Sequence, residues 1–316
     1  MSRRSLYLAI GYSCNHSCVF CPRGLDSIHS VLRNDTQLLE SLDEIFRLRE
    51  ISHVTVSGGE PTLQPCFLDV MSHLAGLGVD VGILSNADRF SDIAIVRELA
   101  DVFPVNRLSV TTSIHSRISE LHERISGTLG SFSRSIAGLH NLESLNIRVN
   151  IKHIVNRYSY RDMSEFVRWS SDEFPGVSLI DITGMDLCGM KDSARATIAV
   201  PNMEAGCFLE EAADAYEKTR GEGFRGKLKF SDLPLCCVDP FYWKYFALRD
   251  SDESGAYVAP AVNGRIIAHT ELESDCGNFS SECAKCGVRE ICPGLWRTHY
   301  DYFGCNDTRA VVLYKA

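Results

Sequence analysis

Three cysteines near the start of the chain have a spacing that suits a metal cluster. They are Cys14, Cys18 and Cys21, in the pattern C-x3-C-x2-C. Thiolates are soft ligands that select zinc or iron–sulfur clusters. A structural zinc site uses four ligands, so three thiolates from one loop favour an iron–sulfur cube with one iron left open to a substrate or cofactor. A zinc site that borrows His16 or a remote residue, and thiols that bind nothing, are the alternatives.

Cysteines gather again near the end of the chain, where seven of the thirteen lie between positions 236 and 305. Cys283, Cys286 and Cys292 form a C-x2-C-x5-C element, and Cys236 or Cys237 can supply a remote fourth thiolate. Four thiolates can close a tetrahedral zinc site or hold an iron–sulfur cluster. The spacing alone leaves both open, and the presence of the first cysteine group favours iron and sulfide.

Two short motifs follow the second and third strands that we expect from the sequence. Gly58, Gly59 and Glu60 come after the second strand. Glycines allow a close backbone approach to a ligand, and a carboxylate can receive an ammonium group. Ser85 and Asn86 come after the third strand and suit ribose hydroxyls. Each motif alone is also ordinary turn chemistry, but their position at consecutive strand ends, with the first cysteines, favours a ligand site.

Six strand-like runs, which alternate with amphipathic stretches, must position these groups. The runs are rich in Val and Ile, which is typical of strands buried on both faces. Serial β–α units predict a parallel sheet with right-handed crossovers, and six units are two short of a closed eight-fold barrel. The expected strands cover about 5–10, 52–57, 79–84, 106–113, 146–154 and 177–183, and the expected helices about 34–48, 65–77, 91–101, 131–143 and 160–173.

The pattern changes near residue 200. A helix-like stretch from Met203 to Lys218 precedes a loop rich in Gly, Lys and Arg over 220–229, short strand-like fragments and the cysteine-rich end. We therefore expect an α/β fold with two parts. The first is a partial (β/α)6 barrel of the TIM type over residues 1–200, and the second is a small, cysteine-rich α+β domain over residues 201–316.

Composition and charge exclude several classes of protein. Among the 316 residues, 32 Lys and Arg stand against 41 Asp and Glu, and the net charge of −9 argues against a general nucleic-acid binder. The apolar run near the start is shorter than the core of a signal peptide or a membrane span. We expect no nucleic-acid partner, no membrane association and a cytoplasmic location, where thirteen thiols favour metal binding over disulfides.

The first cysteine motif, with Phe20 before its last cysteine and Gly-Gly-Glu one strand later, resembles the radical S-adenosylmethionine (SAM) superfamily over about residues 5–185. The resemblance implies that Cys14, Cys18 and Cys21 hold a 4Fe–4S cluster whose open iron binds the amino and carboxylate groups of SAM. One-electron reduction by a partner such as flavodoxin or ferredoxin then cleaves SAM to methionine and a 5′-deoxyadenosyl radical, which abstracts a hydrogen atom from the substrate.

The same resemblance implies which residues face SAM. Carried over by position, they are Gly58, Gly59 and Glu60 at the methionyl amine, Ser85 and Asn86 near the ribose, Ser113 and Lys152 at the ribose or carboxylate, and Phe20 beside the adenine.

The end of the chain resembles the auxiliary-cluster domains, of SPASM or twitch type, of radical SAM enzymes. Their full pattern continues C-x3-C, where this chain has Trp296. The resemblance therefore implies one auxiliary 4Fe–4S cluster, with the ligands Cys236, Cys283, Cys286 and Cys292. The arrangement is most similar to maturases of His-Xaa-Ser peptides and to enzymes that epimerise or dehydrogenate aminoglycosides.

These features predict an enzyme that abstracts hydrogen from an unactivated C–H bond of a natural product. The barrel starts almost at once and leaves no room for an N-terminal leader-binding module, so the sequence favours a small aminoglycoside-like substrate over a ribosomal peptide. Net oxidation and epimerisation both stay open, and epimerisation would use Cys188 or Cys237 as the hydrogen-atom donor. His115 and His122 follow the fourth strand and could face the substrate, but solvated loop histidines are more common and are the expectation. A non-catalytic iron–sulfur or zinc protein is the alternative from another class.

Overall fold

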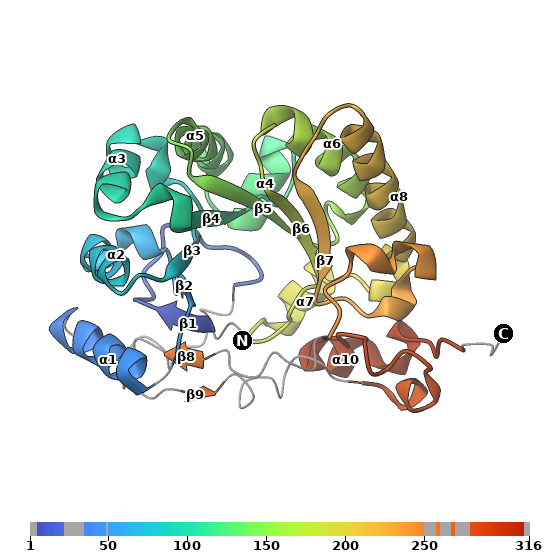
Figure 1. The fold of residues 1–316 in the computed structure, drawn as a ribbon. Helices are drawn as coiled ribbons and strands as arrows, with labels where there is room; N and C mark the ends of the chain where they lie inside the picture. Colours follow the sequence, from blue (N-terminus) through green and yellow to red (C-terminus); the bar gives the residue numbers. More distant parts are fainter. Residues whose placement is uncertain are drawn as a thin grey trace.

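A computed structural model describes residues 5–21, 35–48, 50–249, 257–259, 267–268 and 279–312. Its strands form one sheet in the order β7-β6-β5-β4-β3-β2-β1-β8-β9. All neighbouring pairs are parallel except β8 and β9. The sheet curves around a central axis (Figure 1). The strands are β1 (Ser5–Ala9), β2 (His53–Ser57), β3 (Asp80–Leu84), β4 (Leu108–Ser113), β5 (Arg148–Ile154), β6 (Leu179–Thr183), β7 (Lys227–Ser231), β8 (Tyr257–Ala259) and β9 (Ile267–Ala268).

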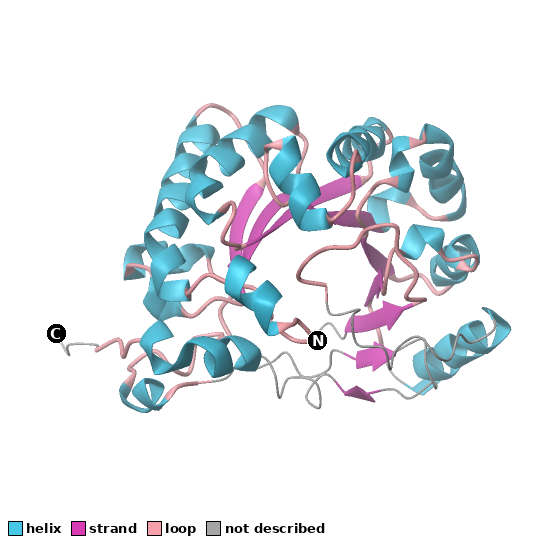
Figure 2. Ribbon diagram, turned by 180° about the vertical axis from the view of Figure 1, so that it is seen from behind, coloured by secondary structure: helices cyan, strands magenta, loops and turns pink. Residues whose placement is uncertain are grey.

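Helices cover the outer, convex side of this sheet. The helices α2, α3, α5, α6 and α8 follow one another around it, as the views from the two sides show (Figure 1, Figure 2). None of the helices that the structure describes combines the length and apolar character needed to cross a membrane. The helices are α1 (Asp35–Leu48), α2 (Phe67–Gly76), α3 (Ile93–Val102), α4 (Ser119–Ser126), α5 (Ser131–Ser144), α6 (Met163–Glu173), α7 (Asp192–Ile198), α8 (Asn202–Gly221) and α10 (Arg297–Phe303).

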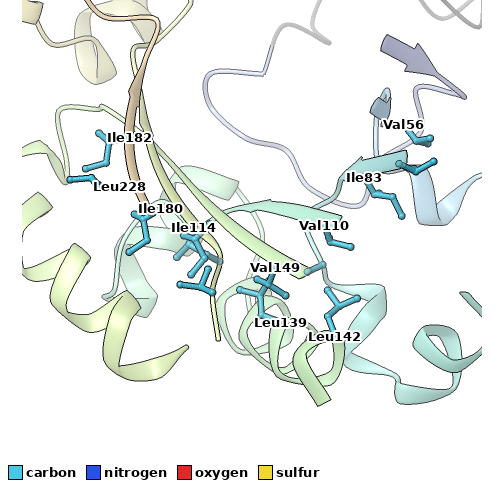
Figure 3. Close-up of a cluster of buried hydrophobic side chains, with 14 of the residues drawn as sticks. Val56, Ile83, Val110, Ile114, Leu139, Leu142, Val149, Ile180, Ile182 and Leu228 are labelled. Carbon is cyan, nitrogen blue, oxygen red and sulfur yellow. The ribbon is translucent and has the colours of Figure 1, made fainter. Parts of the chain in front are cut away.

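The outer face of the sheet carries the hydrophobic core. Val110 of β4 and Val149 of β5 lie near Leu139 and Leu142 of α5 (Figure 3). Successive residues of a strand point to opposite faces of the sheet. The residues that point to the inner face of this sheet are more polar and partly exposed, as Lys152 of β5 is. The expectation of strands buried on both faces is therefore wrong for the inner face. That face is polar because it turns towards the interior of the barrel, where the candidate site lies.

The six expected strands and the partial-barrel fold are confirmed, and the sheet extends beyond them. The expected loop over 220–229 is wrong in its second half, because Lys227–Ser231 forms β7 and pairs with β6. Leu228 and Phe230 lie on the buried outer face of β7, and the two lysines of this strand lie on its inner face. A period of two is a weak signal over a strand of five residues. The division of the chain near residue 200 stays a prediction.

A buried polar network joins the end of the chain to the start of α8. Asp307 accepts hydrogen bonds from Asn202 Nδ2 at 2.9 Å and from the backbone nitrogen of Met203 at 3.0 Å. His299 of α10 lies 3.0 Å from the same carboxylate, and both side chains are almost fully buried. Because a buried polar group that loses its partner costs about 1–3 kcal/mol, this network holds the C-terminal segment against the barrel.

Candidate functional site

The loop that carries Cys14, Cys18 and Cys21 follows β1, at the edge of the sheet where the parallel strands end. The N–H groups of Ser17 and Val19 each donate to a backbone oxygen at the end of α4 at 2.9 Å. The three thiols are partly exposed. Three accessible thiols on one anchored loop fit a cluster that keeps one iron free for a further ligand.

The Gly-Gly turn after β2 lies directly against the cysteine loop. Gly58 has a φ of +126°, and a Cβ there would lie 2.0 Å from the backbone oxygen of Gly11. A Cβ on Gly59 would lie 2.3 Å from the backbone oxygen of Ser13. The N–H of Gly59 also donates to Gly11 at 2.7 Å. Both glycines are therefore required by contact with the cysteine loop, and their predicted contact with SAM stays a prediction.

Glu60 is buried beneath the same turn, with 1% of its surface exposed. Its Oε1 accepts hydrogen bonds from the backbone and hydroxyl of Thr62 and from Ser85 Oγ, and its Oε2 accepts one from the N–H of Asn86 at 2.7 Å. Burial raises the pKa of Glu60, and the four hydrogen bonds oppose that rise. The side chain ties the end of β2 to the end of β3. It thereby positions Ser85 and Asn86, whereas its predicted contact with the methionyl amine stays a prediction.

Asp88 connects the turn after β3 to the cysteine loop. Its Oδ2 accepts a hydrogen bond from Asn15 at 3.0 Å and lies 3.1 Å from His16 Nε2 and 3.0 Å from Arg134 Nε. Asn86 in turn donates to Asn15 Oδ1 at 2.7 Å. Burial acts to raise the pKa of Asp88, but His16 and Arg134 together outweigh it and lower the pKa. Sequence reasoning missed this residue, whose only signal is a Ser-Asn-x-Asp turn after a strand.

Phe20, which precedes the last cysteine of the loop, packs against buried histidines. Its ring meets His115 edge-on with centroids 5.0 Å apart, and His115 stacks on His122 at 5.1 Å. The histidines are 3% and 1% exposed, so the expectation of solvated loop histidines is wrong: α4 carries His122 back over the end of β4. Burial lowers the pKa of both, that of His122 to about 4. The predicted contact of Phe20 with adenine stays a prediction.

Ser113 and Lys152, the expected SAM contacts on later strands, are neighbours in the sheet. Ser113 ends β4 and pairs in register with Lys152 on β5. Both are partly exposed, and their strand positions place them on the inner face. The register continues to Asp181 on β6 and Lys229 on β7. Sequence reasoning missed Lys229 because β7 itself was not expected, and it missed Asp181 because only the register between β5, β6 and β7 brings that residue beside the two lysines.

Four cysteines at the end of the chain line one small cavity. They are Cys236, Cys283, Cys286 and Cys292. Four thiols around one cavity can hold a zinc ion or an iron–sulfur cluster, and the first cysteine group favours iron and sulfide. Every one of the four sulfurs also has a backbone N–H or hydroxyl group within 3.5 Å, supplied by Leu235, Ser280, Gly294, Arg309 and Val311.

The structure separates the two adjacent cysteines that the sequence left as alternatives. Cys236 lines the cavity with its three partners. Cys237 belongs to the hydrophobic core, and a Cβ on Gly206 of α8 would lie 1.9 Å from its backbone oxygen. The predicted set of four thiols is thus brought together, and their role as ligands stays a prediction. Cys276 lies outside the described residues.

Comparison with known proteins places the barrel in a family. A family model of the radical SAM superfamily matches residues 8–170, which is more than half of the chain. The mycofactocin maturase MftC of Mycobacterium tuberculosis is 26% identical over 161 residues, 51% of this chain and 40% of that protein. A probable GTP 3′,8-cyclase of Saccharolobus islandicus is 26% identical over 170 residues, 53% of each protein. The chain thus spans about half, or less, of the length of these relatives.

Similar solved structures extend over nearly the whole chain. Streptococcus suis SuiB bound to its precursor peptide SuiA has a TM-score of 0.66 at 13% identity, covering 98% of this chain and 75% of SuiB. The protein anSMEcpe bound to SAM and the Cp18Cys peptide has a TM-score of 0.65 at 14% identity, covering 98% of this chain and 93% of that protein. At such identities the likeness concerns the fold alone. Radical SAM proteins bind a 4Fe–4S cluster and SAM, and the matched residues include the cysteine loop and the strand ends around it. The chain belongs to the radical SAM superfamily.

Proposed function

We propose that the protein is a maturase that modifies a ribosomally made peptide at an unactivated C–H bond. One sequence relative is a maturase by name, and two structural relatives were solved with peptides bound. An aminoglycoside-like substrate, which the sequence favoured, has no support among these relatives and becomes the second candidate. The observation that carries the proposal is the cavity lined by four cysteines, in a chain whose fold matches the peptide-bound structures over 98% of its length.

The two groups of cysteines have separate tasks in this proposal. Cys14, Cys18 and Cys21 hold the cluster that, with SAM bound, supplies one-electron cleavage and a radical able to abstract hydrogen. Ser113 and Lys152 bind the ribose or carboxylate of SAM from the inner face of the sheet. The four C-terminal thiols hold an auxiliary cluster, which can accept an electron from the substrate. A flavodoxin or ferredoxin is the expected source of the first electron.

Of the two expected hydrogen-atom donors, Cys188 has the better position. It lies in the loop after β6, where Met185, Leu187 and Met190 form a hydrophobic cluster with Ile125. Phe20 of the cysteine loop packs against this same cluster. Cys188 is partly exposed, whereas Cys237 is buried in the core. We therefore place epimerisation, with Cys188 as donor, beside net oxidation as the two reactions this site supports.

Mass spectrometry of peptides tests the function. The protein is co-expressed with each short peptide encoded beside its gene, in light and in heavy water, and the products are compared with those of a Cys14→Ala variant. Epimerisation adds one deuterium in heavy water, and dehydrogenation or cross-linking removes two hydrogens. In Cys188→Ala, loss of the deuterated product identifies the donor. If no peptide changes while an aminoglycoside does, the second candidate is correct. No SAM cleavage by the reconstituted protein would disprove both.

A further inference from the structure

Three buried polar atoms lie together at the ends of β6 and β7. Asp181 Oδ1, Thr183 Oγ1 and Ser231 Oγ have no hydrogen-bond partner among the residues that the structure describes. Thr183 and Ser231 are 3% and 8% exposed and pair in register across the two strands. Asp181 lies two residues earlier on β6, hence on the same face. Because buried polar atoms are almost always satisfied, three unpaired ones in one place indicate a ligand.

Charged side chains surround these atoms. Lys152, Asp181 and Lys229 form one row across β5, β6 and β7. Asp232 directly follows β7: burial raises its pKa, Lys152 and Lys229 lower it, and Asp181 and Asp186 raise it further. Lys152, Lys229, Asp181 and Asp186 are therefore all close enough to act on Asp232. Three carboxylates against two ammonium groups give these surroundings a net negative charge, which favours a cationic ligand.

Asp232 has a left-handed backbone with a φ of +56°, a region that aspartate and asparagine enter more readily than most other residues. Gly184 packs so closely on it that a Cβ there would lie 2.1 Å from the oxygen of Asp232. This contact holds Asp232 against the end of β6. Asp181 and Asp232 both remain partly exposed, so a solute can reach their carboxylates.

We propose that the inner face at the ends of β6 and β7 is a subsite for a primary ammonium group of the substrate. Given the proposed function, on which this inference rests, that group is the side chain of a lysine in the peptide. The carboxylates of Asp181 and Asp232 bind the ammonium, and the hydroxyls of Thr183 and Ser231 complete its surroundings. An ammonium group has three N–H donors and no acceptor, one for each unpaired atom of Asp181, Thr183 and Ser231, and Asp232 attracts it by its negative charge.

Binding of capped amino acids to the reconstituted protein, with SAM present, tests the subsite. Equilibrium dialysis without oxygen measures the dissociation constants of N-acetyl-lysine methylamide, its norleucine analogue and its glutamate analogue. We expect the lysine probe to bind roughly tenfold more tightly than the norleucine probe. Asp181→Asn and Asp232→Asn should each remove this preference; asparagine tolerates the left-handed backbone at 232. Asp172→Asn, on the exposed side of α6, is the matched control and should keep the preference.

Thr183→Val separates a binding role from a structural one. In the protein without substrate the Thr183 hydroxyl is buried and unpaired, so its removal should keep or raise the melting temperature. The same variant should weaken binding of the lysine probe. A hydroxyl with a merely structural role would give the opposite result, a lower melting temperature and unchanged probe binding.

Equal binding of the lysine and norleucine probes to the wild type, or preference for the glutamate probe, would overturn the subsite. A large loss of SAM affinity in Asp181→Asn would assign these atoms to the cofactor site and overturn it as well. Failure of the proposed function would look different. A wild type that prefers the lysine probe but leaves every co-expressed peptide unmodified retains the ammonium subsite and loses the peptide reaction.

Discussion

The two cysteine groups of this protein are built in different ways. Cys14, Cys18 and Cys21 come from a single loop and stay partly exposed. The C-terminal group draws Cys236 from one segment and its three partners from another, about fifty residues further on, around one cavity. The hydrogen-bond donors to the second group lie near residues 235, 280, 294 and 309–311, so this site exists only when these segments have folded together.

This difference matches two different tasks. A cluster on three accessible thiols can take SAM at its open iron, so its loop must be fixed relative to the strand ends that hold the rest of SAM. Gly59 and Asp88 fix it there. A cluster held by four thiols has no iron left open and can exchange electrons without exchanging ligands. The first site therefore depends on local loop geometry, and the second on assembly of the whole C-terminal segment.

Removal of the first three thiols should have the largest effect. In a Cys14/Cys18/Cys21→Ala variant we expect SAM cleavage to vanish, because no other described group can hold that cluster. Iron should fall from about eight to about four per chain, at about four per cluster. The loss of stability should be smaller than for loss of the second cluster, because the cysteine loop is also held by backbone hydrogen bonds to α4. Iron, sulfide and 5′-deoxyadenosine assays after anaerobic reconstitution check this. Four irons falling to none, with one zinc throughout, would contradict the auxiliary cluster.

The adjacent pair Cys236 and Cys237 tests the second site. Cys236→Ser should lose one cluster, keep SAM cleavage, and lower the free energy of unfolding by about 2–4 kcal/mol, because bound metal contributes to folding. Cys237→Ser places a hydroxyl in the core and should cost about 1–3 kcal/mol with all iron retained. Iron content and urea unfolding measure both effects. Loss of iron in Cys237→Ser and not in Cys236→Ser would reverse the ligand assignment.

The features that could be predicted from the sequence are those that short-range patterns of residues encode. The first six strands end within two residues of their expected ends because runs of Val and Ile mark each outer face. The first cysteine loop was recognisable because its three thiols are contiguous. Cys236 and Cys237 could not be distinguished, since only the packing of α8 against one of them decides which faces the cavity. Asp88 and Ser231 owe their surroundings to contacts between segments distant in sequence, and no spacing reveals those.

Gly59→Ala should disturb the first site and spare the second. The new Cβ would lie 2.3 Å from the backbone oxygen of Ser13, so the cysteine loop must shift. We expect SAM to bind at least about tenfold more weakly, because overpacking of this kind costs about 1–3 kcal/mol, with the auxiliary iron unchanged. Gly221→Ala, where a Cβ meets nothing within 4 Å, is the control. Equal SAM affinity in the two variants would show that the loop does not depend on Gly59.

Buried histidines of the barrel should give the smallest effect, a dependence of stability on pH. Burial lowers the pKa of His122 and His153 to about 4, below the value of about 6.5 in the unfolded chain. Below about pH 6.5 the unfolded chain binds protons that the native barrel does not. The free energy of unfolding is therefore highest above about pH 6.5 and falls as the pH drops towards 4. Between about pH 7 and about pH 5.5, each histidine should lower the free energy of unfolding by about 1 kcal/mol. Urea unfolding measures this change.

His153→Gln should reduce the slope of the free energy of unfolding against pH by about one proton. His140→Gln, on the exposed side of α5, serves as the matched control. An unchanged slope in His153→Gln would contradict the assignment.

The same titration distinguishes the two sites. His122 lies on α4, the helix whose last turn anchors the cysteine loop, so the first cluster should be lost at a higher pH than the second. Iron retained at each pH by Cys236→Ser and by the triple variant, which keep one site each, measures this. Loss at one common pH would mean that barrel and chain end unfold as a single unit.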